Sequence, residues 1–243
     1  YTVALSRNNT YTNPIFPLGG SEFVISARFS LPYSLWNGID YANLGDLEKY
    51  QDDDGNPDPA KIEQEKFRWL EFYKVKFKGS WYTRLFDKLV LRTHTEFGFL
   101  WAFNNDRGVI PFDRFFLGGD VMSQYAMDGR ETISLRVYPN QSLSTQDGST
   151  IYNRFSLELR YPITLKPAAS IFGLTFLETG QGYNSFREFN PFNGKRSLVL
   201  GLRIFMPAFG LLGIDFGYGL DAVNDFDLTP NGWETHFVIG QQF

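Results

Sequence analysis

Apolar and polar residues alternate with a period of two along most of this chain. In residues 233–243, one face carries Trp233, Phe237, Ile239 and Phe243, and the other carries mostly polar and small residues. Because successive side chains of a strand point to opposite sides of a sheet, this pattern predicts β-strands whose two faces meet different environments. We expect nine strands, and the pattern is clearest in 22–31, 69–81, 89–103, 154–163, 197–206, 211–220 and 233–243.

The polar face of these strands distinguishes a membrane barrel from a soluble β protein. Its charged residues alternate with strongly apolar partners over about ten residues, the strand length that crosses a bilayer. The pattern therefore predicts an all-β, transmembrane antiparallel barrel with lipid outside and a polar interior. A soluble sandwich or lipocalin-type barrel, which would place the apolar face inside, is the alternative. The charged residues are Lys74, Lys76, Lys78, Arg92, Glu96, Glu158, Arg160, Arg203 and Asp215.

The connections between the expected strands alternate in length. Short periplasmic turns and longer extracellular loops are typical of outer-membrane barrels, so the lengths assign the two sides and place the chain's end at the periplasm. An odd number of strands, together with a first strand that begins at Tyr1, predicts the later part of a longer barrel. The short connections are 84–88, 164–169 and 207–210; the long ones are 33–66, 104–150, 180–196 and 221–232.

Composition narrows the possible functions. The longest uncharged apolar stretch, Ile204–Ile214, has 11 residues and contains Pro207, so no segment is long enough for a membrane-spanning helix. A net charge of −4 disfavours nucleic-acid binding on a basic surface. The absence of cysteine from these 243 residues excludes zinc–thiolate sites and thiol nucleophiles within them. Aromatic residues make up 18% of the chain, which excludes disorder.

Two segments of the second long connection form a recognisable motif. Phe115-Phe116-Leu117-Gly118-Gly119 is followed by Leu135-Arg136-Val137-Tyr138. These segments resemble the sixth extracellular loop of BamA-type assembly factors, the superfamily that includes TamA, Sam50 and Toc75. In that family an apolar-Arg-Gly-aromatic motif folds back into the barrel. Further similarities run in the same order along nearly the whole chain, at 16–21, 156–162, 176–180 and 240–243, and residues 128–131 are similar to Bacteroidota members.

The resemblance implies how the chain is organised. Residues 1–243 would be the C-terminal part of an outer-membrane barrel, with strands 8 to 16 of sixteen. The loop 104–150 would fold into the lumen, and the periplasmic POTRA domains and early strands would lie outside this chain. One position departs from the family motif, because Val137 stands where the motif has glycine. A β-branched residue disfavours a left-handed backbone, so we expect either that the loop sits differently or that the function of its tip is altered.

Arg136 is the first candidate functional residue. A guanidinium inside a barrel needs a carboxylate partner, and Glu158 lies on the lumen-facing phase of its strand. Glu178 matches the family's second acidic position, but its phase is ambiguous. It faces the lumen only if Phe172 and Phe176 do so as well, or if a bulge shifts the register. The expected role is pinning of the loop, so Arg136→Ala should reduce assembly activity, whereas Arg107→Ala should be mild.

The terminal strand is the second candidate site. In a closed barrel it forms the seam with the first strand, and in the family that seam opens so that a nascent strand can pair with it. A transient edge offers unpaired N–H and C=O groups, which makes strand addition physically reasonable. We expect Gly240 to allow a kink, because glycine weakens strand pairing. The seam residues are Trp233, Phe237, Ile239, Gly240 and Phe243.

Catalytic and metal sites are not expected. His94 and His236 lie on lumen-facing phases of different strands, and no motif places a nucleophile beside either of them. The run Asp52-Asp53-Asp54 lacks the distant glutamate of an EF-hand loop, which favours a solvated acidic loop.

The sequence as a whole predicts an outer-membrane protein insertase without cofactor or metal. Its expected partners are nascent outer-membrane proteins, accessory lipoproteins and the lipid bilayer of a Gram-negative cell. A polypeptide translocation pore of the same superfamily is the alternative. A porin and a barrel-embedded hydrolase are further possibilities.

Overall fold

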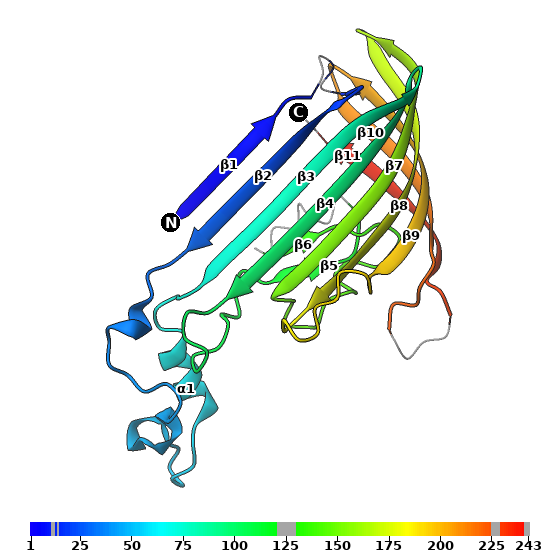
Figure 1. Ribbon diagram of the computed structural model, residues 1–243. Coiled ribbons are helices and arrows are strands. Elements are labelled where there is room, and N and C mark those ends of the chain that lie inside the picture. The colour runs from blue at the N-terminus through cyan, green and yellow to red at the C-terminus, as the bar shows by residue number, and fades with distance from the viewer. Residues whose placement is uncertain (11–12, 14, 121–129, 225–228, 241–243) are drawn as a thin grey trace.

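The computed structural model describes residues 1–10, 13, 15–120, 130–224 and 229–240. Nine long strands form one continuous antiparallel sheet that curves into part of a barrel wall (Figure 1). In sheet order these are β1 (Thr2–Asn8), β2 (Gly20–Phe29), β3 (Tyr73–Phe86), β4 (Leu89–Trp101), β7 (Ile151–Lys166), β8 (Ala169–Tyr183), β9 (Lys195–Met206), β10 (Gly210–Gly219) and β11 (Gly232–Gly240). The nine-stranded antiparallel fold predicted from the alternation is confirmed.

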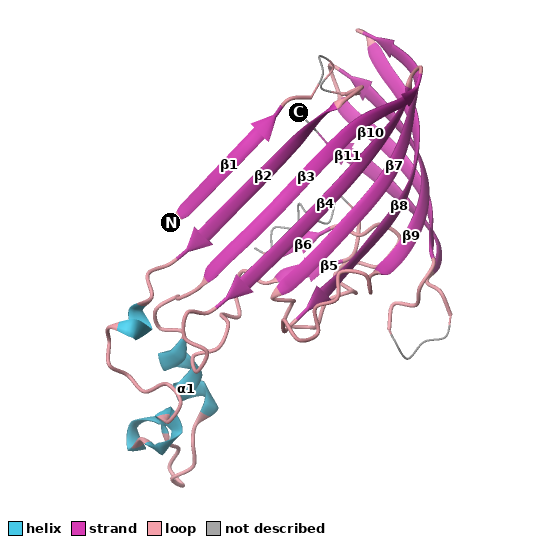
Figure 2. Cartoon of the chain, in the orientation of Figure 1, coloured by secondary structure: helices cyan, strands magenta, loops and turns pink. Residues whose placement is uncertain are grey.

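Short turns lie at one end of the sheet and long connections at the other (Figure 2). The turns 87–88, 167–168 and 207–209 close three hairpins. The connections at the opposite end span 30–72, 102–150, 184–194 and 220–231. β1 and β11 are the two edge strands.

Two of these long connections contain structure of their own. Residues 33–72, which we call the outer subdomain, carry three short 3-10 helices, η1 (Tyr33–Leu35), η2 (Leu44–Asp46) and η3 (Glu48–Tyr50), and the helix α1 (Pro59–Lys66). The 102–150 connection carries the short parallel pair β5 (Phe115–Leu117) and β6 (Glu131–Ile133), which alternation did not predict. None of the helices in the described ranges is long and apolar enough to cross a membrane.

The two faces of the sheet have inverted polarity relative to a soluble protein. Large apolar side chains on the outer face are exposed, including Leu157 at 49%, Leu200 at 66% and Phe237 at 60%. Charged side chains on the concave face are buried, including Glu158 at 3% and Asp215 at 0%. An apolar exterior around a polar interior is the arrangement that lipid requires of a barrel wall.

Several strand ends differ from those expected. β3 begins at Tyr73 rather than at residue 69, because Glu71 and the chain before it are held by Arg107 in another loop. β7 extends beyond the expected 154–163 in both directions, and its register with β8 shifts between Pro162 and Thr164. A proline cannot donate a ladder hydrogen bond, so it suits an irregular point in a strand.

Candidate functional site

The 102–150 connection packs several buried apolar side chains against the concave face of the sheet. Phe115, Leu117, Leu135 and Tyr138 are all at most 1% exposed, and they share one cluster with Leu100 and Tyr152 of the wall. The rings of Phe115 and Tyr152 meet edge to face at 4.6 Å. Burial of this many apolar side chains fixes the loop tip, residues 135–138, at one place inside the curve of the sheet.

Arg136 lies between two carboxylates at that place. Its Nη1 is 3.3 Å from Asp215 Oδ2 on β10, and its Nη2 is 3.5 Å from Glu178 Oε1 on β8. Its backbone N–H also donates to Glu178 Oε2 at 3.0 Å. The guanidinium stacks over Phe176, 3.8 Å from the ring centroid. Arg136 is thus held by charge, hydrogen bonding and a cation–π contact at once.

The expected pairing of Arg136 with Glu158 is wrong. Glu158 Oε2 accepts from Arg92 Nη1 at 3.2 Å, and Glu158 Oε1 accepts from Arg160 Nε at 2.6 Å. Strand phase places Glu158 on the inner face correctly, but the two neighbouring arginines of β4 and β7 already neutralise it. The partner is instead Asp215, which the alternation also places inside but does not distinguish from the other inner carboxylates.

The structure resolves the ambiguous phase of Glu178. Phe172, Leu174, Phe176 and Glu178 are all buried on the concave face, and the register of β8 with β9 is unbroken from Ser170 to Gly180. The inner face of β8 is therefore apolar at one end and charged at the other. Its apolar part packs against Phe16, whose ring lies 5.3 Å from that of Phe172.

The two carboxylates belong to a continuous chain of buried ion pairs across the inner wall. Arg154 of β7 joins Glu178 at 2.5 Å to Glu96 of β4 at 3.2 Å. On the other side, Arg203 of β9 donates to Asp215 at 2.6 and 2.8 Å. Each charge has an opposite neighbour, which is the condition under which ions are tolerated in a buried site. A polar cavity of about 520 Å³ lies against this wall.

Val137 adopts the left-handed backbone that its side chain disfavours, with φ of +82°. The expected change in the position or function of the loop tip stays a prediction, but the valine does not exclude the left-handed backbone here. The neighbouring strand explains why, since Gly217 of β10 faces the Val137 side chain. A Cβ built on Gly217 would lie 2.2 Å from Val137 Cγ2, so the missing side chain on β10 provides the space.

Tyr138 anchors the next position of the loop tip. Its hydroxyl donates to the Arg196 carbonyl at 2.6 Å and accepts from the Asp221 N–H at 3.3 Å. Burial raises the pKa of Tyr138 to about 12, so the phenol remains a donor at physiological pH. Leu135, at the start of the motif, is fully buried and forms a bridge with Gly119.

The terminal strand presents Trp233, Phe237 and Ile239 on the outer face, with at least 54% of each exposed. Its ladder with β10 runs without a shift from Gly232 to Gly240. Gly240, where a kink is expected, is the last described residue of this strand and pairs with Leu211, so the kink stays a prediction. Phe243 lies outside the described residues.

His94 has neighbours that the sequence did not reveal. Ser80 Oγ is 2.8 Å from His94 Nδ1, and His94 Nε2 is 2.8 Å from Glu96 Oε1. The constellation resembles a serine–histidine–acid arrangement, but Arg92 also donates to the Ser80 hydroxyl at 3.1 Å, and Ser80 is only 2% exposed. A substrate carbonyl cannot approach the Ser80 hydroxyl in this conformation. Ser80, His94 and Glu96 therefore act as part of the network of buried polar side chains on the inner wall.

The acidic run at Asp52 is organised by backbone hydrogen bonds. Asp52 Oδ1 accepts from the N–H groups of Asp54 and Asn56 at 3.0 and 2.8 Å. The Asn56 N–H is the main reason that the pKa of Asp52 is lowered. Among the residues that the structure describes, no cluster of three or more His, Cys, Asp or Glu side chains is arranged to hold a metal ion.

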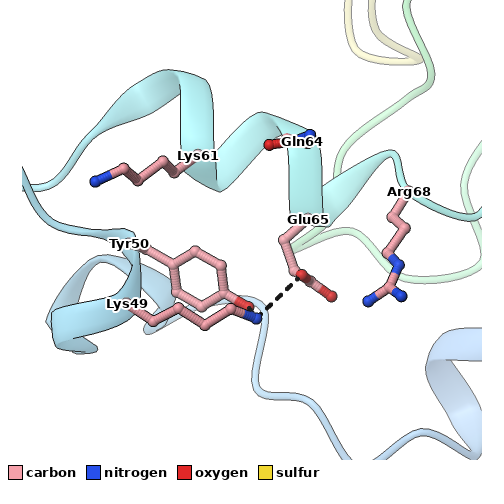
Figure 3. A pocket seen from close by; sticks show the side chains of 6 residues that line it. All are labelled: Lys49, Tyr50, Lys61, Gln64, Glu65 and Arg68. Atoms are coloured by element: carbon pink, nitrogen blue, oxygen red, sulfur yellow. Dashed lines mark hydrogen bonds and ion pairs between the residues drawn. The ribbon is translucent and has the colours of Figure 1, made fainter.

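The outer subdomain has its own small core and surface pocket. Tyr41, Leu44 and Tyr50 are buried together, and the helix α1 is capped by Asp58. The pocket lies between η3 and α1, where Lys49 Nζ is 3.6 Å from Glu65 Oε2 (Figure 3). Its lining residues are Lys49, Tyr50, Lys61, Gln64, Glu65 and Arg68.

Arg107 ties this subdomain to the 102–150 connection. It donates to Glu71 Oε2 at 2.6 Å, contacts the Lys66 carbonyl and lies over the ring of Tyr41. Both Arg107 and Glu71 are less than 5% exposed. Arg107 is therefore a buried and paired residue, whereas the expected mild effect of Arg107→Ala on assembly activity stays a prediction.

We expect Arg107→Ala to loosen the outer subdomain. Removing one partner of a buried ion pair typically costs about 3–5 kcal/mol, because the other charge is left buried. Limited digestion with proteinase K should therefore cleave within 33–72 faster in this variant, while Arg187→Ala, an exposed loop position, should behave as the parent. Equal cleavage of all three proteins would contradict the anchoring role.

The fold and loop define the class of protein: a barrel wall whose long connection places an arginine in an acidic cradle on its inner face. The family model of the Omp85 superfamily domain matches residues 8–243, so the chain belongs to the Omp85 superfamily. Its structure is similar to the crystal structure of BamA from Haemophilus ducreyi lacking POTRA domains 1–3, with a TM-score of 0.58 and 18% identity. That match covers 98% of this chain and 41% of the other. A search of curated protein sequences finds no match.

Proposed function

We propose that this chain is the C-terminal barrel portion of an outer-membrane protein insertase. The observation that carries the proposal is the seating of Arg136 between Glu178 and Asp215 within an Omp85 fold. Pinning the loop tip to β8 and β10 keeps the 102–150 connection inside the barrel. The edge strand β11 is not part of the chain of buried ion pairs. The residues assigned to this pinning motif are Leu135, Arg136, Val137 and Tyr138.

The proposed mechanism uses backbone pairing and needs no nucleotide or cofactor. An unpaired strand edge is costly in lipid, because its N–H and C=O groups find no water there. A nascent strand that pairs with β11 removes that cost for both chains. Insertion then proceeds strand by strand at the seam.

The complete protein is proposed to extend beyond this chain. It would carry periplasmic POTRA domains and the early strands of a sixteen-stranded barrel, in the outer membrane of a Gram-negative bacterium related to the Bacteroidota. Nascent outer-membrane proteins are its proposed clients, and accessory lipoproteins its proposed partners. The outer subdomain would then face the cell exterior, on the side of the long connections.

A polypeptide translocation pore of the same superfamily is the second candidate. The polar cavity of about 520 Å³ beside the chain of buried ion pairs favours it, since a secreted chain needs an aqueous path. The buried loop favours the insertase, because it fills the curve of the sheet. A porin or a hydrolase barrel receives less support: the loop obstructs the interior and Arg92 covers Ser80.

Reconstitution of the full-length protein in lipid vesicles separates the two candidates. For an insertase, we expect urea-denatured barrel clients to fold into the vesicles faster than into protein-free vesicles, with little increase in ion conductance. Steady conductance and passage of a secreted polypeptide, without faster client folding, would contradict the insertase and support the pore.

A further inference from the structure

The backbone of Val137 is held on both sides by residues of the terminal strand region. Its N–H donates to His236 Nε2 at 2.9 Å, and its carbonyl accepts from Asn231 Nδ2 at 2.6 Å. His236 lies on β11, and Asn231 immediately precedes that strand. Because a backbone N–H can only donate, the Nε2 of His236 must carry the lone pair, and its proton lies on Nδ1.

These two hydrogen bonds hold Val137 in a conformation that it would otherwise leave. A β-branched residue at φ of +82° is strained, and such strain persists only where the surroundings determine the backbone. The Val137 side chain fits over Gly217 and Gly219 of β10, and its peptide groups are fixed from β11. If the hydrogen bonds from His236 and Asn231 were lost, the Val137 backbone would therefore relax from this strained conformation.

Val137 and Arg136 contact different parts of the wall. Arg136 pairs with residues of β8 and β10, which are interior strands with a neighbour on each side. The contacts of Val137 with His236 and Asn231 reach the edge strand, in addition to the ladder that joins β11 to β10. The loop tip thus grips β11 from the lumen side, through side chains that no family motif of the loop includes.

We propose that His236 and Asn231 form a latch through which the loop tip holds the terminal strand in its closed position. His236 is a positioning residue in this proposal: it acts through the Val137 backbone. Outward movement of β11 at the seam would require both hydrogen bonds to break. The inference rests on the proposed function for its biological role, but the latch itself is a physical contact that can be measured without a client.

Hydrogen exchange on the full-length protein in lipid nanodiscs tests the latch. Peptides covering 133–139 and 232–240 report the loop tip and the terminal strand. We expect His236→Leu to raise exchange in both peptides by roughly two- to tenfold, the effect of losing one net hydrogen bond. Exchange in His236→Gln should stay near the parent, because a glutamine side-chain oxygen can still accept from the Val137 N–H.

Two further variants complete the test. Asn231 lies outside the strand, and Asn231→Ala removes its hydrogen bond to the Val137 carbonyl. This variant should therefore raise exchange at 133–139 even if His236→Leu fails to fold. Thr235 lies on the outer face of β11, so Thr235→Val should leave hydrogen exchange in both peptides unchanged. Unchanged exchange in Asn231→Ala and His236→Leu, or equal effects of leucine and glutamine at position 236, would overturn the latch.

Client insertion by the same proteins tests the proposed function separately. An open latch should raise the rate of seam opening, so His236→Leu should alter the insertion rate and His236→Gln should restore it. If the parent inserts no client, the insertase proposal fails, while the exchange results still support or contradict the latch.

Discussion

Arg136→Ala is expected to slow client insertion about tenfold or more. The substitution removes the contacts of Arg136 with Glu178 and Asp215 and leaves both carboxylates at 0% exposure. Breaking a buried ion pair costs about 3–5 kcal/mol when a charge is left without a partner, and the second arginine beside each carboxylate, Arg154 or Arg203, lowers that cost here. If about 1.4 kcal/mol of that loss appears in the rate-limiting step, the rate falls tenfold. The measurement is the folding rate of a denatured client in vesicles that contain the full-length variant.

Two controls accompany Arg136→Ala. Arg136→Lys keeps the charge but not the fork of donors, so it should recover only part of the rate. Arg84→Ala removes an exposed arginine near the turn after β3 and should leave the rate unchanged. Similar losses in Arg136→Ala and Arg84→Ala would show that the assay reports general damage instead of the cradle.

Gly217→Ala is expected to destabilise the loop tip. The new Cβ would lie 2.2 Å from Val137 Cγ2 and 2.9 Å from Val199 Cγ2, so at least one of these side chains must move. Overpacking of this kind typically costs about 1–3 kcal/mol. Midpoints of urea unfolding in lipid, monitored by the mobility shift of the folded barrel on gels, should fall accordingly.

A second substitution should compensate for the first. Val137→Gly relieves both the left-handed strain and the clash, so the pair Val137→Gly with Gly217→Ala should be more stable than Gly217→Ala alone. Recovery should be partial, because Val199 still faces the new methyl group. Strict additivity of the two effects would contradict the contact between positions 137 and 217.

Much of the fold was predictable, because it follows from local alternation. A period of two assigned Glu158 and Asp215 to the inner face and Leu200 and Phe237 to the outer face, as the burial shows. The lengths of the connections likewise distinguished the end of the sheet that carries short turns from the end that carries long loops. The exception was β8, where Phe172 and Phe176 face inward because partners distant in sequence, Phe16 and Arg136, cover them.

The pairings in the site could not be predicted from phase alone. The alternation shows which face a carboxylate occupies but not its depth along the barrel, so it cannot show that Arg92 and Arg160 already pair with Glu158. The conformation of Val137 depends on Gly217, which lies 80 positions further along the chain. The pairing of Arg107 was not predictable for the same reason, since its partner Glu71 lies in a different connection.

A cryo-electron microscopy structure of the complete protein in a lipid bilayer tests the central claim most directly. We expect the loop tip inside the barrel, Arg136 within hydrogen-bonding distance of both Glu178 and Asp215, and no open channel past the loop. A loop that lies outside the lumen with Arg136 in solvent, beside a continuous aqueous channel and a fully paired seam, would contradict the account.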